Sequence, residues 1–315
     1  MIDFHDLQLS DKKWMDVRFR QSDFIGCDYD FAWLYPSKDT YHVQVAEVAD
    51  FLCIRAQIGN HLEYWFPTGN GDKKEIIALL QADAHEHQQP LVLHTVLNEE
   101  VSWLQQEYPD LFSYEAVRDV FDYIYTTEHL INLSGKKLRG KRNLMNQFKE
   151  ANDWYYEKLT DENIFECLEL SKKWSALREN GANSNLKEDI ECAETIVKNY
   201  KELGLQGGLL RKAGNVVAFA IGGPLNSNTF VEYVEKADIE VTGAYTMIYQ
   251  QFVQNECSQY QYLNAACDLG EDGIRNSKLL YYPDILLEKY TVTENYSFKK
   301  PGLKSSLKKI LKKII

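Results

Sequence analysis

A cluster of positive charge between Ser134 and Phe148 is the first feature of this sequence that could do chemistry. The stretch contains no carboxylate, although the chain has a formal net charge of -12. Its candidate substrate-binding residues are Lys136, Lys137, Arg139, Lys141, Arg142 and Asn143. Such a cluster attracts anions. Ser134 is a favourable N-cap, so the sequence predicts a basic helix over 134–148.

The phase of this helix divides the basic side chains between two faces. At about 100° per residue, Arg139, Arg142 and Asn143 share a polar face, whereas Lys137 and Lys141 fall on the apolar arc. Two explanations remain for the two lysines. Either their methylene stems cover the core while the ammonium groups reach water, or they line a cleft that binds a negatively charged ligand.

A second concentration of polar residues lies between Asn264 and Pro283. It follows a predicted strand and opens a short helix, which is a position where α/β proteins place ligands. The candidate catalytic residues here are Asp268 and Tyr281, and the candidate substrate-binding residues are Arg275 and Lys278. The alternative is that the Asp and Gly residues of this stretch form ordinary helix caps and turns.

Two glutamates, Glu232 and Glu235, lie in a predicted strand of the same half. A carboxylate in a central strand must be exposed, paired or functional. Glu232 lies on the strand face opposite Tyr233. If that face lines a cleft, Glu232 is the natural general base for deprotonating an amine or hydroxyl. A solvated glutamate at a sheet edge is the alternative.

The elements that must position these residues occur in the same order twice. The expected helices are 10–22, 73–87, 98–107, 161–177, 187–203, 243–257 and 272–278. The expected strands are 31–35, 42–48, 51–58, 62–66, 90–96, 154–159, 206–211, 216–221, 229–234, 260–265 and 285–292. Each half reads as antiparallel meander, helix, strand, helix. The sequence therefore predicts an α/β (α+β) fold with two similar domains, 1–118 and 135–298, joined by a crossing over 119–134.

Composition places the chain among globular proteins long enough for two domains. Hydrophobic residues make up 44% and charged residues 26%. There is no run of about 18 apolar residues that could span a membrane. The N-terminus lacks the features of a signal peptide, so we expect a cytoplasmic protein. The six cysteines and seven histidines are scattered, a distribution that predicts reduced thiols and no metal site.

The segment 299–315 is a basic amphipathic stretch. It contains seven lysines and no acid, and its leucines and isoleucines recur at helical spacing. This pattern predicts a helix that lies on the inner face of an anionic membrane and makes the protein a peripheral membrane protein. The alternatives are a tail that packs on the acidic body of the protein and a disordered tail.

Motifs of several enzyme classes are absent from the sequence. There is no Gly-x-x-x-x-Gly-Lys-Ser/Thr, Gly-x-Ser-x-Gly, His-Glu-x-x-His or Gly-x-Gly-x-x-Gly. Nucleotide triphosphatase, α/β-hydrolase, zinc protease and dinucleotide-binding functions therefore lose their usual support.

Two groups of motifs resemble the bacterial DUF2156 family, which is related to the C-terminal domain of phosphatidylglycerol lysyltransferases. The first is Asp122-Tyr123-Ile124-Tyr125 with Gly135-Lys136-Lys137 and Lys141-Arg142-Asn143. The second is Asp268-Leu269-Gly270 with Gly273-Ile274-Arg275-Asn276-Ser277-Lys278 and Tyr281.

The resemblance implies two tandem GNAT-like acyltransferase domains. In the lysyltransferases, an aminoacyl group moves from charged tRNA to the headgroup of phosphatidylglycerol. Carried to this sequence, the basic helix 134–148 would meet tRNA or lipid phosphate, and the tail would hold the enzyme on the bilayer. The acceptor would be a lipid or another small molecule with an amine or hydroxyl.

The corresponding coenzyme A loop departs from the GNAT pattern. GNAT enzymes hold the pyrophosphate with Gln/Arg-x-x-Gly-x-Gly/Ala at a helix N-terminus. Here Glu240 replaces the leading residue and Tyr245 blocks the second small position. We therefore expect no coenzyme A and favour aminoacyl-tRNA, or another bulky activated donor. The alternatives are an acyl-CoA-dependent N-acyltransferase and a non-catalytic module that binds anionic lipid or nucleic acid.

Overall fold

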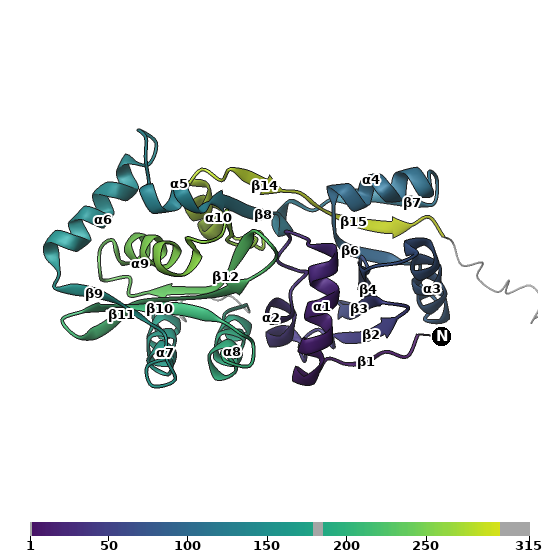
Figure 1. Ribbon diagram of the computed structural model, residues 1–315, viewed down its shortest axis with the longest axis horizontal. Helices are drawn as coiled ribbons and strands as arrows, with labels where there is room; N and C mark the ends of the chain where they lie inside the picture. Colours follow the sequence, from purple (N-terminus) through teal and green to yellow (C-terminus); the bar gives the residue numbers. More distant parts are fainter. Residues whose placement is uncertain (1, 179–184, 297–315) are drawn as a thin grey trace, which may run out of the picture.

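The computed structural model describes residues 2–178 and 185–296, which form two mixed sheets side by side along the long axis of the molecule (Figure 1). In spatial order, the first sheet contains β1 (His5–Asp6), β2 (Gln44–Val48), β3 (Phe51–Ile58), β4 (His61–Trp65), β6 (Val92–Leu97), β15 (Lys289–Glu294) and β7 (Phe112–Ala116), and β5 (Thr68–Gly69) pairs with β3. The second contains β14 (Ile285–Leu287), β8 (Asp122–Thr126), β13 (Tyr262–Asn264), β12 (Thr229–Ala237), β11 (Asn215–Pro224), β10 (Gln206–Lys212) and β9 (Trp154–Lys158).

Helices cover these sheets and connect their strands. The α-helices are α1 (Lys12–Ser22), α2 (Phe31–Leu34), α3 (Lys73–Glu86), α4 (Asn98–Glu107), α5 (Thr127–Asn132), α6 (Arg139–Ala151), α7 (Glu166–Arg178), α8 (Asn185–Lys198), α9 (Ala244–Phe252) and α10 (Asp272–Leu279). A π-helical turn, Val253–Cys257, extends α9. In the second sheet, α9 covers one face, and α7 and α8 cover the other (Figure 1). Within the described part of the chain, none of these helices is long and apolar enough to cross a lipid bilayer.

The two sheets share one topology, which confirms the α+β fold with tandem GNAT-like domains. In each, an antiparallel meander (β2–β4 or β10–β12) is followed by a helix (α3 or α9) and a further strand (β6 or β13). That helix is a crossover connection, so the next strand lies parallel to its neighbour. The parallel pairs are accordingly β4–β6 and β12–β13.

Each sheet is completed by a strand from the other half of the chain, and here the structure departs from the expected division. The stretch 285–292 forms two strands, with β14 paired to β8 in the second sheet and β15 placed between β6 and β7 in the first. Likewise β8, in the expected crossing 119–134, is a strand of the second sheet. The sheets therefore do not follow the boundaries 1–118 and 135–298. The sheet to which a strand belongs depends on the strand with which its backbone pairs, and that partner can be distant in the chain.

Smaller corrections have local causes. The expected strand 31–35 is helical, because the carboxylate of Asp30 accepts bonds from the N–H groups of Ala32 (2.7 Å) and Trp33 (3.2 Å) and so caps α2. The basic helix begins at Arg139 instead of Ser134, after a turn in which Gly135 has a φ of +84°. The predicted tail helix 299–315 lies outside the described residues.

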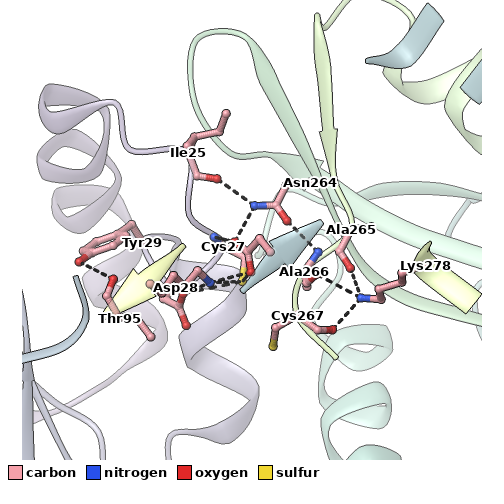
Figure 2. A network of polar contacts seen from close by, with 12 residues as sticks. Ile25, Cys27, Asp28, Tyr29, Thr95, Asn264, Ala265, Ala266, Cys267 and Lys278 are labelled. Atoms are coloured by element: carbon pink, nitrogen blue, oxygen red, sulfur yellow. Dashed lines mark hydrogen bonds and ion pairs between the residues drawn. The ribbon is translucent and has the colours of Figure 1, made fainter. Parts of the chain in front are cut away.

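A buried ionic junction of Cys27, Asp28, Asp122, Asn264 and Lys289 ties the two sheets together. Lys289 is fully buried; its ammonium contacts Asp28, Asp122 (2.6 Å) and the thiol of Cys27 (3.5 Å). Asn264 of β13 donates to Asp122 of the neighbouring strand β8 (2.8 Å) and, as Figure 2 shows, to the carbonyl of Ile25 in the first half of the chain (2.8 Å). Burial would lower the pKa of Lys289, but Asp122 and Asp28 raise it well above its usual value. The junction is therefore a charged, hydrogen-bonded core between the sheets.

Candidate active site

The candidate active site is organised by an irregularity in β12. Two successive residues of β11, Ile221 and Gly222, pair with Val234 and Glu232, so Tyr233 is an additional residue without a partner across the ladder. One extra residue in an antiparallel pair is a β-bulge.

The bulge brings two acidic side chains to the same face. In a regular strand, Glu232 and Glu235 would point to opposite faces because they are three residues apart. The bulge shifts the alternation by one, so both lie on the face that carries Phe230 and Ala237, which belong to the core packed against α9. We call Glu232 and Glu235 the glutamate pair.

The surroundings of the glutamate pair favour the protonated forms. Each residue has one carboxylate oxygen that is buried without a hydrogen-bond partner. Burial raises the pKa of Glu232 to about 7, although the positive charge of Lys278 opposes the shift. Burial and the neighbouring charge of Glu232 raise the pKa of Glu235 well above its usual value. Near neutral pH, Glu232 can therefore both accept and release a proton, which is the property of a general base.

Three tyrosines and one lysine surround the pair. The ring of Tyr281 packs edge-on against Tyr249 of α9 (4.9 Å between centroids) and Tyr125 of β8 (6.4 Å). The ammonium of Lys141 lies 3.8 Å from the centroid of Tyr281. Burial lowers the pKa of Lys141, while Glu235 acts in the opposite direction. We call these four residues and the glutamate pair the glutamate–tyrosine cluster.

This cluster brings together three of the residues that the sequence singled out, Glu232, Tyr281 and Lys141. They come from β12, the turn after α10, and α6, which are far apart in the chain. An acceptor amine or hydroxyl beside Glu232 could lose its proton there. The ammonium of Lys141 could stabilise negative charge developing nearby.

Lys278 lies next to the cluster, and its ammonium group donates hydrogen bonds to three backbone carbonyls. Its ammonium donates to the carbonyls of Ala265, Ala266 (3.2 Å) and Cys267 (2.7 Å), where the chain leaves β13 (Figure 2). Its carbonyl accepts from the hydroxyl of Tyr125 (2.7 Å). Lys278 thus supplies a fixed positive charge that opposes the rise in the pKa values of the glutamate pair, and it holds α10 against the end of β13.

Asp268 and Arg275 form a separate ion pair. Asp268 is fully buried and accepts from the guanidinium nitrogens Nε (2.9 Å) and Nη2 (2.8 Å) of Arg275 and from Nη1 of Arg118 (3.2 Å). Burial would raise the pKa of Asp268, but Arg275 and the hydroxyl of Tyr123 hold it well below its usual value. Asp268 therefore stays ionised, and its contacts are those of a residue that anchors α10.

We predict that Asp268→Asn acts on stability and leaves catalysis little changed. Losing charged hydrogen bonds at a buried position should lower the free energy of unfolding by about 2–3 kcal/mol at neutral pH. Because the folded pKa is lowered, the contribution of Asp268 is present above its unfolded value of about 3.8 and is lost in stronger acid. Urea unfolding at several pH values measures this. A large loss of turnover at unchanged stability would instead make Asp268 catalytic.

The basic residues before and within α6 play different parts. Lys136 and Lys137 lie in the turn that precedes α6, and both are exposed. Arg139 and Asn143, within α6, are exposed as well. The guanidinium of Arg142 donates to the carbonyls of Leu133 and Gly135 (2.7 Å), so it stabilises the turn. The exposed members are the ones available to an anionic ligand.

Sequence reasoning missed part of the glutamate–tyrosine cluster. Glu235 was recognised only as a neighbour of Glu232, since regular alternation places it on the other face. Tyr125 and Tyr249 carry no local signal, because a tyrosine in a strand or an apolar helix face is an ordinary core residue. Only the cross-strand register and the packing of α9 reveal their positions.

The paired sheets with their exchanged strands define a tandem GNAT-like fold, and the glutamate–tyrosine cluster lies in its second half. Residues 19–293 match the family described as "Phosphatidylglycerol lysyltransferase, C-terminal". The chain belongs to this family, which is also known as DUF2156.

Several solved structures share this fold. The chain is 34% identical to a conserved protein of unknown function from Bacteroides thetaiotaomicron VPI-5482, with a TM-score of 0.90 over 94% of this chain and 100% of that one. It also resembles in fold the C-terminal domain (DUF2156) of a putative lysylphosphatidylglycerol synthetase from Agrobacterium fabrum, with 13% identity and a TM-score of 0.66 over 96% of this chain and 94% of that one. The fold of L-PGS from Bacillus licheniformis is similar too, with 15% identity and a TM-score of 0.60 over 87% of this chain and 95% of that one.

Proposed function

We propose that this chain transfers an aminoacyl group from aminoacyl-tRNA to an amine or hydroxyl acceptor, such as the headgroup of phosphatidylglycerol. The observation that carries the proposal is the glutamate pair with raised pKa values beside Lys141. Membership of the phosphatidylglycerol lysyltransferase family supports the same chemistry.

In the proposed reaction, Glu232 takes the proton of the acceptor as its oxygen or nitrogen attacks the ester carbonyl. The ester bond to the tRNA ribose then breaks, and Glu232 returns the proton to the departing hydroxyl. The ammonium of Lys141 balances the negative charge on the tetrahedral intermediate. Attack on an activated ester needs mainly positioning, so the buried cluster holds the acceptor close and excludes competing water.

The exposed basic residues suit the phosphates of the donor. Lys136, Lys137 and Arg139 present positive charge on the turn and first residues of α6, close to the cluster through Lys141. Arg142 keeps this turn in place. Tyr281 and Lys278 shape the acceptor side, and Asp268 and Arg275 fix α10.

The packing around α9 supports a donor other than coenzyme A. Gly243, with a φ of +82°, precedes α9, and a Cβ there would come within 2.4 Å of the carbonyl oxygen of Leu144 in α6. The backbone of α6 therefore lies against the N-terminus where a GNAT enzyme would hold the pyrophosphate. Glu240 adds negative charge next to it. Calorimetric titration distinguishes the donors, because binding at micromolar coenzyme A would favour an acyl-CoA-dependent N-acyltransferase.

Transfer of labelled lysine from charged tRNA to phosphatidylglycerol vesicles is the direct test, with other charged tRNAs and soluble amines and alcohols as further arms. Labelled product in any arm supports the proposal. Labelled tRNA that stays intact across the whole panel contradicts it.

Within this function, Lys141→Gln should lower kcat by about ten- to a hundredfold, since it removes a charge from a partly buried site where the reaction builds up negative charge. Lys149→Gln, at the exposed C-terminal end of the same helix, is the matched control and should change kcat little. Single-turnover transfer from prebound charged tRNA measures the chemical step. Equal effects of both substitutions would place Lys141 among general phosphate contacts instead.

A further inference from the structure

The segment 23–30, which connects α1 to α2, contacts several strands of the second sheet. The carboxylate of Asp23 accepts from the N–H (2.9 Å) and the hydroxyl (2.7 Å) of Ser227, in the turn between β11 and β12. The carbonyl of Ile25 accepts from the amide of Asn264 in β13 (Figure 2). In Figure 1, α1 and α2 lie on the side of the first sheet that faces the second. The first half of the chain therefore holds the hairpin that carries the glutamate pair.

The segment also reaches the bulge in β12, through a hydrogen bond between Asp30 and Tyr233. The hydroxyl of Tyr233 donates to Oδ2 of Asp30 at 2.6 Å, the short distance of a charge-assisted hydrogen bond. Burial raises the pKa of Asp30 to about 6, so this carboxylate is ionised at pH 8. Burial and the charge of Asp30 raise the pKa of Tyr233 well above its usual value, so the hydroxyl keeps the proton that it donates. Because the same carboxylate caps α2, Tyr233 is connected to a fixed point in the first half.

The packing around the bulge shows what this connection holds in place. Tyr233 and the next residue, Val234, both pack into the core on the side of the sheet opposite α9. In a regular strand, successive side chains would point to opposite faces. Across the ladder, Gly222 gives the bulge room, because a Cβ there would come within 2.2 Å of the carbonyl oxygen of Val231. Tyr233 is thus the residue at which the alternation of β12 shifts by one.

We propose that Tyr233 is a positioning residue, whose hydrogen bond to Asp30 holds the bulge in register and so keeps the glutamate pair on one face of the sheet. Tyr233 touches no substrate in this role and acts through the backbone of its neighbour Glu232. Loss of the bulge would restore the regular alternation and turn one of the two carboxyl groups away from α9. The effect on turnover rests on the proposed function, whereas the arrangement of the pair is independent of any activity.

Tyr233→Phe tests the proposal, because it removes the hydroxyl and keeps the ring. NMR titration of the protein labelled with ¹³C at the glutamate carboxyl carbons follows the pair, and Glu232→Gln and Glu235→Gln assign the two signals. In the wild type, both carboxyls should titrate above the usual value of 4.5. In Tyr233→Phe the loosened bulge separates the pair, so at least one of them should titrate lower by about one pH unit or more.

Substitutions at Asp30 separate the hydrogen bond from the cap of α2. Asp30→Asn keeps both the cap and an oxygen that accepts from Tyr233, so its titration should resemble that of the wild type. Asp30→Ser also caps α2, but its shorter side chain does not reach the hydroxyl, so it should reproduce the effect of Tyr233→Phe. Tyr290→Phe is the matched control, because Tyr290 of β15 donates to the carboxylate of Glu288 (2.7 Å) in the first sheet, and it should leave the titration unchanged.

Turnover provides the second measurement. Tyr233→Phe should lower kcat about tenfold and leave KM for charged tRNA unchanged, because the base is misplaced while the phosphate contacts remain. An unchanged titration in Tyr233→Phe or in Asp30→Ser overturns the proposal, even if the free energy of unfolding falls, since the hydrogen bond would then only join the two halves. A shifted titration in a protein that shows no aminoacyl transfer would reject the proposed function and leave the positioning role of Tyr233 intact.

Discussion

Glu232→Gln should lower the rate of aminoacyl transfer by about 100- to 10,000-fold, the range expected when a general base is removed. The amide keeps the shape of the side chain but cannot take the acceptor proton. Single-turnover transfer from charged tRNA measures the chemical step directly. Glu256→Gln is the matched control, because Glu256 is a buried glutamate of the second half of the chain that lies outside the cluster and accepts from the hydroxyl of Tyr156 (3.0 Å).

The same residue predicts the pH dependence of the reaction. Glu232 must be ionised to act as a base, so with a pKa of about 7 the transfer rate should fall as the pH drops through neutrality. In Glu232→Gln, the residual rate should lose this dependence. A wild-type profile that is flat between pH 5 and 8 would contradict the assignment of Glu232 as the base.

Glu232→Gln should also stabilise the protein above neutral pH, because the raised pKa of Glu232 makes its ionised form costly in the folded state. The folded pKa lies above the usual value of 4.5, so the native state holds this proton more tightly than the unfolded chain does. Its stabilising contribution is complete below pH 4.5 and is lost as the pH rises through about 7. At pH 8 the variant should therefore gain on the order of 1–3 kcal/mol in free energy of unfolding. Lower stability with unchanged turnover would show that Glu232 is a packing residue.

Much of the fold follows from local patterns in the sequence. The alternation of β2–β4 and β10–β12 and the periodicity of α3 and α9 mark the elements, and their repeated order predicts two similar units. The motifs around Lys136 and Asp268 indicate the family. These features are local because hydrophobic periodicity depends only on residues a few positions apart.

The features that sequence reasoning missed depend on contacts between distant residues. Nothing in the sequence of the run 285–292 shows that β14 and β15 pair with different sheets. The bulge that aligns Glu235 with Glu232 exists only in the register between β12 and β11. A helix at Phe31 is decided by the carboxylate of Asp30 and not by the apolar residues that suggested a strand.

Lys289 illustrates the same point for charge. A lysine in a short strand is normally taken as a surface residue, yet this one is fully buried between Asp28 and Asp122. Among the residues that the structure describes, Cys27, Asp28 and Asp122 are also the group whose ligand atoms lie close enough to hold a metal ion. The ammonium of Lys289 contacts all three of them, so it neutralises the acids from inside the chain.

Lys289→Met should therefore lower the free energy of unfolding by about 3–5 kcal/mol, because it leaves two carboxylates buried without their counter-charge. The methionine fills a similar volume, so the loss reports charge more than packing. The effect should reach both sheets, since Lys289 belongs to β15 of the first sheet and Asp122 to β8 of the second. Urea unfolding followed by circular dichroism measures it.

Two further variants decide whether the loss arises from the uncompensated charge. Adding Asp28→Asn and Asp122→Asn to Lys289→Met should recover most of the stability, since a neutral buried group needs no counter-ion and amides keep part of the hydrogen bonding. Lys74→Met removes a lysine from an exposed pair with Glu107, in which Lys74 is 57% exposed, and should leave the free energy of unfolding nearly unchanged. If the triple variant is no more stable than Lys289→Met alone, the sheets are held by the shape of the junction and not by its charge balance. If charge balance does hold the sheets together, the ion pair between Asp122 and Lys289 helps to determine which sheet β8 and β15 join. In any other arrangement, each of these charged residues would be buried without its partner.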